Sequence, residues 1–179
     1  MKQVNWGIIG LGNIALKFAG GFKNLDNAKL IAISSKNNKK IQNFKEEFHI
    51  KENFCFNNYE DLLKCKDIDI VYLALPNSMH YEWVLKCIEE GKKVLCEKPA
   101  TINFIQIKKI NEEILRKNIL FAEAFMYSYH PQITKIIELI NENIIGKLIS
   151  MESYFGVNIL TKKNFFGFEK RKKINEESR

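Results

Sequence analysis

Short apolar runs alternate with segments of helical spacing along most of this chain, and this alternation limits its fold more than any other feature. Each run has the length and composition of a buried strand. The runs lie at residues 4–10, 28–35, 54–56, 69–75, 93–96 and 119–124. Successive strand–helix–strand units close by right-handed crossovers and build a parallel sheet. The sequence therefore predicts an α/β fold, a doubly wound parallel sheet with helices on both faces.

The pattern changes in the last third of the chain. Isoleucines with helical spacing follow Pro131, and the apolar segment 147–159 has the pattern of a long strand. This strand would open a different sheet. The sequence therefore predicts that a second α+β domain begins in this part of the chain.

Composition and charge narrow the class of protein. The net charge is +7, but residues 162–179 hold seven of the cations and only three of the acids, so the body of the chain is mildly basic. We expect no nucleic-acid partner, and a salt-dependent affinity for DNA or RNA would reveal the alternative of a basic tail that binds one.

No apolar run has transmembrane length and no signal peptide precedes the first strand. We expect a cytoplasmic protein without membrane attachment.

The four cysteines do not form a recognisable metal or redox motif. They are Cys55, Cys65, Cys87 and Cys96, and no two of them have the close spacing of a zinc knuckle or a CxxC pair. We expect free thiols and no metal site.

A glycine-rich turn lies between the first predicted strand and the first predicted helix. It reads Gly10-Leu11-Gly12-Asn13-Ile14-Ala15, a GxGxxA pattern in the strand–turn–helix context that a dinucleotide site requires. Gly10 permits the tight turn, Gly12 lets backbone N–H groups approach a pyrophosphate, and Ala15 allows close packing. The sequence therefore predicts a dinucleotide-binding loop here, the alternative being a turn without a ligand.

The end of the second predicted strand bears on which dinucleotide binds. An NAD site usually presents Asp or Glu at this place to grip the ribose hydroxyls. Here the strand ends in Ser34, Ser35 and Lys36, and no acid occurs between Asp26 and Glu46. A hydroxyl and a cation suit a 2′-phosphate better. We favour NADP over NAD. The alternative is that Lys36 is an ordinary solvated lysine.

Two further strand ends should open into the same crevice. In a doubly wound sheet, strands 69–75 and 93–96 follow the first strand in space, and ligands bind at the carboxyl ends. The second of them runs directly into Glu97, Lys98 and Pro99. A lysine there can donate a hydrogen bond to a substrate oxygen or exchange a proton with it. The alternative is an ion pair of Glu97 with Lys98 that merely caps the strand end.

Together these segments resemble the Gfo/Idh/MocA oxidoreductase family, near its dihydrodiol-dehydrogenase-like and sugar-dehydrogenase branch. The matching segments are "GIIGLGNIA", "SSK", "DIDIVYLALPNSMH", "GKKVLCEKPAT", "AEAFMYSYHP" and "ELINENIIGKLISMESYF". The resemblance implies a Rossmann fold and an NAD(P)-dependent dehydrogenase. Such an enzyme transfers a hydride between the nicotinamide and a sugar-, polyol- or dihydrodiol-type substrate.

The resemblance also assigns roles to residues. It implies that Lys98 is the catalytic or substrate-orienting lysine. The residues it implies for the cofactor site are Gly10, Gly12, Asn13, Ile14, Ser35, Lys36, Leu75, Pro76, Asn77, His80, Glu97 and Lys98.

The chain departs from the family pattern in two ways. Members often have Arg where this chain has Ser128, and they are roughly twice as long, with a second domain that supplies substrate contacts and a D-x-G-x-H or D-x-G-x-Y helix. No such motif occurs here. We therefore expect an N-terminal fragment, with residues 1–122 as the NAD(P)-binding Rossmann domain and residues 123–179 as the start of an incomplete C-terminal substrate and dimerisation domain.

The resemblance leaves two outcomes open. One is a truncated dehydrogenase that acts on a small sugar- or polyol-like molecule, with a homo-oligomer formed through the C-terminal sheet. The other is an inactive cofactor-binding remnant, or a binding module without turnover.

Overall fold

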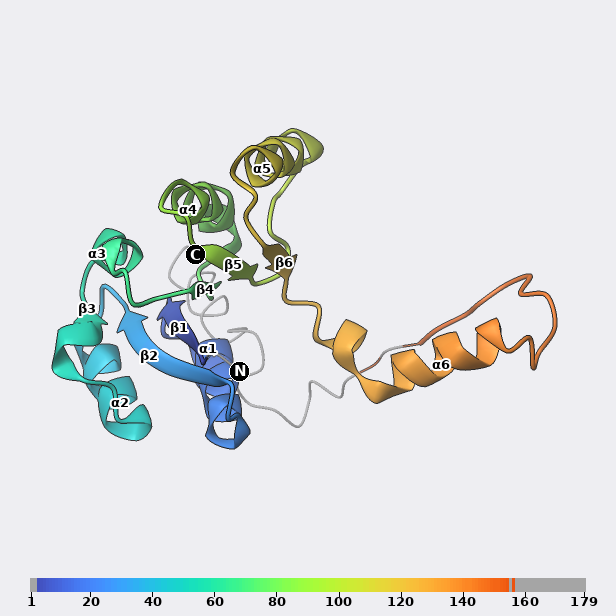
Figure 1. Ribbon diagram of the computed structural model, residues 1–179, viewed down its shortest axis with the longest axis horizontal. Helices are drawn as coiled ribbons and strands as arrows, with labels where there is room; N and C mark the ends of the chain where they lie inside the picture. The colour runs from blue at the N-terminus through green and yellow to red at the C-terminus, as the bar shows by residue number, and fades with distance from the viewer. Residues whose placement is uncertain (1–2, 155, 157–179) are drawn as a thin grey trace, which may run out of the picture. The chain divides into compact units, whose positions relative to one another are not determined.

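A computed structural model describes residues 3–154 and Gly156 of this chain. Its centre is a sheet of six parallel strands in the order β3-β2-β1-β4-β5-β6 (Figure 1). The strands are β1 (Val4–Ile9), β2 (Ala28–Ser34), β3 (Cys55–Phe56), β4 (Ile70–Leu73), β5 (Lys93–Cys96) and β6 (Phe121–Glu123). The order reverses between β1 and β4, as expected of a doubly wound sheet. The predicted doubly wound parallel sheet with helices on both faces is confirmed, while the start of a second α+β domain stays a prediction.

Helices connect the strands and cover both faces of the sheet. They are α1 (Asn13–Gly20), α2 (Asn38–Phe48), α3 (Tyr59–Lys64), α4 (Asn77–Glu89) and α5 (Phe104–Lys117), with short 3-10 turns η1 (Gly21–Asn24) and η2 (Glu52–Phe54). After β6 the chain continues with the 3-10 turn η3 (Met126–Tyr129) and the helix α6 (Pro131–Asn141). Two apolar clusters result. One packs Ala15 of α1 and Phe44 of α2 against the sheet, and the other packs Leu62, Val84 and Ile110 from α3, α4 and α5.

Local sequence explains where several helices begin and end. The side chain of Asn37 caps α2 by accepting a hydrogen bond from the amide of Lys40, and Asn103 caps α5 in the same way. His49 and Asn118 end these two helices in the left-handed conformation, which tolerates such polar residues. These stops return the chain to the edge of the sheet where the next strand begins.

The chain divides into two compact units, one that ends at His130 and one that begins at Pro131. The predicted domain boundary after residue 122 stays a prediction. In the second unit, α6 begins at Pro131 as expected. The strand predicted over residues 147–159 is wrong for residues 147–154, which form no strand, and residues 155 and 157–159 lie outside the described part of the chain. A strand is held by ladder hydrogen bonds, and no described segment pairs with residues 147–154.

Candidate functional site

Four strand ends meet at one edge of the sheet and bring the predicted site residues together. In the strand register, Ile9 of β1 lies opposite Ser34 of β2 and Leu73 of β4, and Leu73 lies opposite Cys96 of β5. The residues that follow these positions are therefore neighbours. This edge carries the glycine-rich turn, the Ser35–Lys36 segment, the Leu75–Asn77 turn and the Glu97–Lys98 pair.

Gly10 makes the turn at the end of β1 for steric reasons. Its φ is +92°, and a Cβ atom here would lie 2.5 Å from the carbonyl oxygen of Ala74. The amide of Gly10 donates to the carbonyl of Ser34 at 3.0 Å, and the side chain of Leu75 lies 3.1 Å from the place of that missing Cβ. Only a glycine permits this close approach between the turns that follow β1 and β4.

Gly12 has a different reason to be glycine. Its backbone is extended, and no atom lies within 4 Å of where a Cβ would stand. Gly12 is the N-cap of α1, no side chain caps that helix, and its first turn contains no acid. The first amide groups of the helix are thus free to bind an anion, and the helix dipole favours one. Asn13 and Ile14 are exposed at this end, while Ala15 is buried against the sheet.

The two residues predicted to choose the dinucleotide lie directly after β2. Ser35 is buried, its amide donates to the carbonyl of Phe56, and its hydroxyl accepts a hydrogen bond from the amide of Asn37. Lys36 is exposed, and its ammonium lies 5.7 Å from the centre of the Tyr59 ring. A cation thus stands where NAD sites usually present an acid.

The turn after β4 is the next segment along this edge of the sheet. Ala74 donates its amide to the carbonyl of Ile9, which ties this turn to β1. Leu75 is buried, whereas Pro76 and Asn77 are exposed at the start of α4. Pro76 serves as the N-cap of that helix. Pro76 and Asn77 are therefore available to a ligand at the sheet edge.

His80, which the resemblance places at the cofactor, lies on α4, and its role there stays a prediction. It is fully buried beneath the surface of the site. Its Nδ1 lies 2.7 Å from the carbonyl oxygen of Pro99, and its Nε2 lies 2.8 Å from that of Leu75. His80 therefore joins the turn after β4 to the turn after β5.

Glu97 does not use Lys98 as its partner. The hydroxyl of Tyr72, on β4, donates to the Glu97 carboxylate at 2.5 Å, and the amide of Glu97 donates to the carbonyl of Leu73. Burial and the hydrogen bond to Glu97 raise the pKa of Tyr72 well above its ordinary value. Tyr72 therefore keeps its proton and remains a donor to Glu97.

Lys98 is exposed at the end of β5. Within residues 3–154 and Gly156, its ammonium makes no hydrogen bond and no ion pair. The alternative of an ion pair with Glu97 is thus absent from the described structure. The strand end presents one carboxylate that already has a partner and one lysine whose donors are free.

Two residues of this region were not predicted from the sequence. They are Tyr72 and Glu123, whose Oε1 accepts a hydrogen bond from the amide of Ala100 at 2.7 Å. The sequence did offer a signal for both residues, because buried polar groups need partners. Tyr72 places a hydroxyl within an apolar strand, and Glu123 places a carboxylate at the end of β6.

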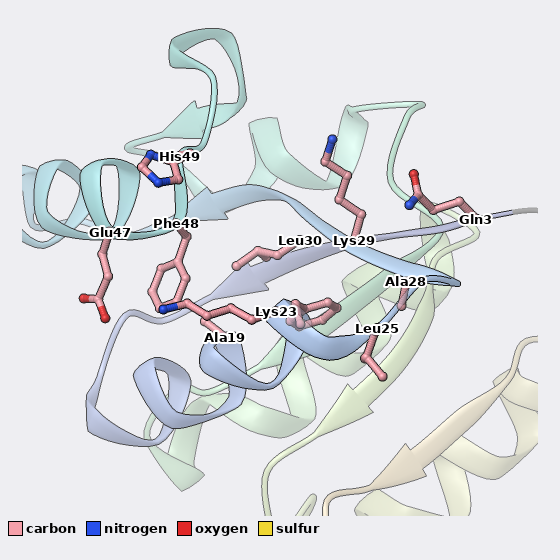
Figure 2. Close-up of a pocket in the computed structure, with 11 residues that line it drawn as sticks. Gln3, Ala19, Lys23, Leu25, Ala28, Lys29, Leu30, Glu47, Phe48 and His49 are labelled. Carbon is pink, nitrogen blue, oxygen red and sulfur yellow. The ribbon is translucent and has the colours of Figure 1, made fainter.

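The cavity shown in Figure 2 lies elsewhere, beside the amino-terminal half of β2. Its volume is about 420 Å³, and none of the predicted site residues lines it. The residues around it are Gln3, Ala19, Phe22, Lys23, Leu25, Ala28, Lys29, Leu30, Glu47, Phe48 and His49. Ligands of doubly wound sheets bind at the carboxyl ends of the strands, so the candidate site remains at the opposite edge.

Two observations on the described residues bear on other classes of site. No group of three His, Cys, Asp or Glu side chains among them is placed to hold a metal ion. None of their helices is both long and apolar enough to cross a bilayer.

A family match and individual relatives both connect this chain with oxidoreductases. Residues 4–125 match the GFO_IDH_MocA family, described as an oxidoreductase family with an NAD-binding Rossmann fold. A trans-1,2-dihydrobenzene-1,2-diol dehydrogenase from Xenopus tropicalis is 30% identical over 156 residues, which are 86% of this chain and 47% of the relative. This chain thus spans about half the length of the curated relatives it matches.

Solved structures with this fold include complexes with both dinucleotides. KijD10, a 3-ketoreductase from Actinomadura kijaniata in complex with NADP and TDP-benzene, superposes with a TM-score of 0.73 at 28% identity, over 82% of this chain and 44% of that one. The scyllo-inositol dehydrogenase from Lactobacillus casei with NAD(H) and scyllo-inositol gives a TM-score of 0.75 at 26% identity, over 81% and 43%.

Proposed function

Because this chain belongs to the Gfo/Idh/MocA family of NAD-binding oxidoreductases, we propose that it binds a nicotinamide dinucleotide at the carboxyl ends of β1, β4 and β5. The observation that carries this proposal is the empty space at Gly12, next to an uncapped helix end without an acid. A side chain would fill that space, and an anion is the ligand that the free amides favour.

Different residues at this edge of the sheet bind different parts of the dinucleotide. The amides of the first turn of α1, from Asn13 onward, hold the pyrophosphate, and Gly12 leaves room for its close approach. Pro76 and Asn77 form one wall of the nicotinamide half, with Glu97 and Lys98 near the other. His80 supports these walls from below through its contacts to Leu75 and Pro99.

We propose that the whole protein oxidises or reduces a CH–OH group of a sugar-, polyol- or dihydrodiol-type molecule. A bound nicotinamide supplies the carbon that accepts or donates the hydride. Lys98 donates a hydrogen bond to the substrate oxygen and exchanges a proton with it, because its ammonium has free donors at this edge. The relatives named as a dihydrodiol dehydrogenase, a 3-ketoreductase and an inositol dehydrogenase support this substrate class.

NADP is the dinucleotide that we propose, on the ground of Lys36. A cation at the end of β2 pairs with a 2′-phosphate, whereas an acid there would repel it. The relatives do not decide the question, since one was solved with NADP and another with NAD(H).

A second candidate function is a dinucleotide-binding module without turnover. It is favoured by the placement of the predicted site residues, which all follow the ends of β1, β2, β4 and β5 at the edge where a dinucleotide would bind. Hydride transfer further needs the substrate carbon held within about 3–3.5 Å of the acceptor carbon, which is a separate requirement from cofactor binding. We propose that this chain alone binds the cofactor and turns over slowly or not at all.

Calorimetric titration of the chain with NADP and with NAD tests the binding. NADP should bind, and a chain that binds neither dinucleotide overturns the proposed function. Turnover is then measured with inositols, sugars and cyclic trans-diols for the parent and for Lys98→Met. Turnover in the parent that disappears in Lys98→Met supports the enzyme, while binding without any turnover supports the module.

A further inference from the structure

Three polar contacts from three different elements converge on the segment Glu97–Ala100. They are the hydroxyl of Tyr72 on the Glu97 carboxylate at 2.5 Å, His80 Nδ1 at the carbonyl of Pro99 at 2.7 Å, and Glu123 Oε1 on the amide of Ala100 at 2.7 Å. The donors and acceptors come from β4, α4 and the end of β6. The segment is therefore held at three of its four residues.

The fourth residue is Lys98. Its neighbours on both sides are fixed, while its own ammonium has no partner among the described residues. The direction in which the side chain leaves the backbone is thus set by the fold, and the donors at its tip stay free. This is the arrangement that positions a group for a ligand.

The three contacting side chains are themselves held in place. Tyr72 is 1% exposed, and its ring stacks on that of Phe18 with 4.0 Å between centroids. His80 is fully buried, and its second nitrogen lies at the carbonyl of Leu75. Beside Glu123, the amide of Ala124 donates to the carbonyl of Cys96 at 2.8 Å, which fixes the end of β6 against β5.

We propose that Tyr72, His80 and Glu123, the Lys98 clamp, are positioning residues for Lys98. The role rests on the proposed function, in which Lys98 faces the cofactor and the substrate. Tyr72 holds one oxygen of the Glu97 carboxylate in a place where this carboxylate makes no ion pair with the adjacent ammonium. Glu123 holds the amide of Ala100 and fixes the far end of the segment. Lys98 therefore meets its ligand as an unpaired donor with a set direction.

The first test needs no cofactor. The chain is treated with an amine-acetylating ester, and the acetylation rate of Lys98 is measured by peptide mass spectrometry relative to the exposed Lys108. Tyr72→Phe should lower this rate about three-fold to ten-fold, the range that one hydrogen bond gives, because the freed Glu97 carboxylate then pairs with Lys98. The matched control Tyr81→Phe, on α4, should leave the rate unchanged.

A double variant separates positioning from a general loss of structure. Tyr72→Phe combined with Glu97→Gln should return the Lys98 rate to the parent value, because no carboxylate is left to capture the ammonium. Thermal unfolding of each variant confirms that it is folded under the assay conditions. An unchanged rate in Tyr72→Phe, or a reduced rate that the double variant does not restore, overturns the proposal.

The second test uses NADP and Glu123. Saturating NADP should protect Lys98 of the parent from acetylation, and Glu123→Ala should lose about three-fold to ten-fold of that protection. Glu123→Gln should keep it, since its amide oxygen still accepts from Ala100, and Glu112→Ala on α5 is the control. NADP that binds without protecting Lys98 overturns the clamp. If no dinucleotide binds, the proposed function fails, and the first test alone decides the clamp.

Discussion

At the scale of single residues, side chains close together in the sequence differ in what they contact. Glu97 and Lys98 follow one another, yet the carboxylate accepts a hydrogen bond from Tyr72 and the ammonium stays free. Gly10 and Gly12 belong to one turn, yet the first is required by the fold and the second leaves room at the helix end. In each pair, one residue is engaged by the fold and the other is left free at the edge of the sheet.

The two glycines give a matched pair of variants. Gly10→Ala should destabilise the fold by about 2 kcal/mol, because φ is +92° and the new Cβ would lie 2.5 Å from the Ala74 carbonyl oxygen. Gly12→Val should change stability by at most about 1 kcal/mol, since its backbone is extended and the space is open. It should nevertheless abolish dinucleotide binding. Urea unfolding and calorimetry measure the two effects, and equal NADP affinity in Gly12→Val and the parent would exclude this loop as the site.

Alkaline pH should destabilise the protein, because its buried thiol and phenol groups favour their protonated forms. Burial, with smaller effects of Glu123 and Glu97, raises the pKa of the Cys96 thiol to about 12 from an ordinary 9.0. Burial also raises the pKa of Cys87 and of Tyr72. The native fold retains these protons while the unfolded chain releases them, so the stability is fully present below about pH 9 and falls as the pH rises beyond it.

Urea unfolding between pH 8 and pH 11 measures this fall. Each buried thiol contributes a slope of up to about 1.4 kcal/mol per pH unit above its unfolded pKa. Cys96→Ala should therefore show a shallower decline than the parent. The same slope in both proteins would contradict the assignment.

At the scale of elements, the sequence predicts the strands and helices of the first unit well. Apolar runs such as that of β4 are buried on both faces, so their composition alone identifies them. The segment 147–154 shows the limit, since a strand pattern becomes a strand only where a partner strand pairs with it.

The candidate site is predictable only in part, and the reason is again physical. The glycine turn is local, so its pattern reveals it. The contacts of Tyr72 with Glu97 and of Glu123 with Ala100 join different strands, and no local pattern encodes them. The burial of His80 had a signal in the sequence, because it shares helical spacing with the buried Trp83 and Val84.

The end of β2 supplies a prediction about cofactor choice. Lys36→Asp should lower the affinity for NADP about ten-fold or more and raise that for NAD, because the new carboxylate repels a 2′-phosphate and accepts hydrogen bonds from ribose hydroxyls. Lys39→Asp, an equal charge change on the exposed side of α2, should leave the order of the two affinities unchanged. Calorimetry compares the three proteins, and a parent that prefers NAD would show that the assignment of Lys36 is wrong.

At the scale of the whole molecule, the second unit exposes much apolar surface. Helix α6 has no buried residue, and several large side chains after it are exposed. They include Ile144, Ile145, Leu148, Ile149, Met151 and Tyr154. Patches of this kind favour association.

We expect the isolated chain to self-associate as its concentration rises. Sedimentation velocity measures the effect, and replacing Ile145 and Ile149 by lysine should shift the chain toward monomer because charge opposes the burial of that surface. The same substitutions should not alter the unfolding of the first unit. A parent that stays monomeric across the accessible concentrations would show that this surface is not adhesive.

The strand order has a consequence for the time course of folding. β1 pairs with β2 and β4 pairs with β5 over short stretches of chain, whereas β1 and β4 join residue 6 to residue 70. Closing the longer loop carries the greater entropic penalty, so we expect this central pairing to form last. The turns of Gly10 and Pro76 follow β1 and β4 and meet only there. The ability to capture a dinucleotide should therefore be acquired late in refolding, after each half has formed its own pair of strands.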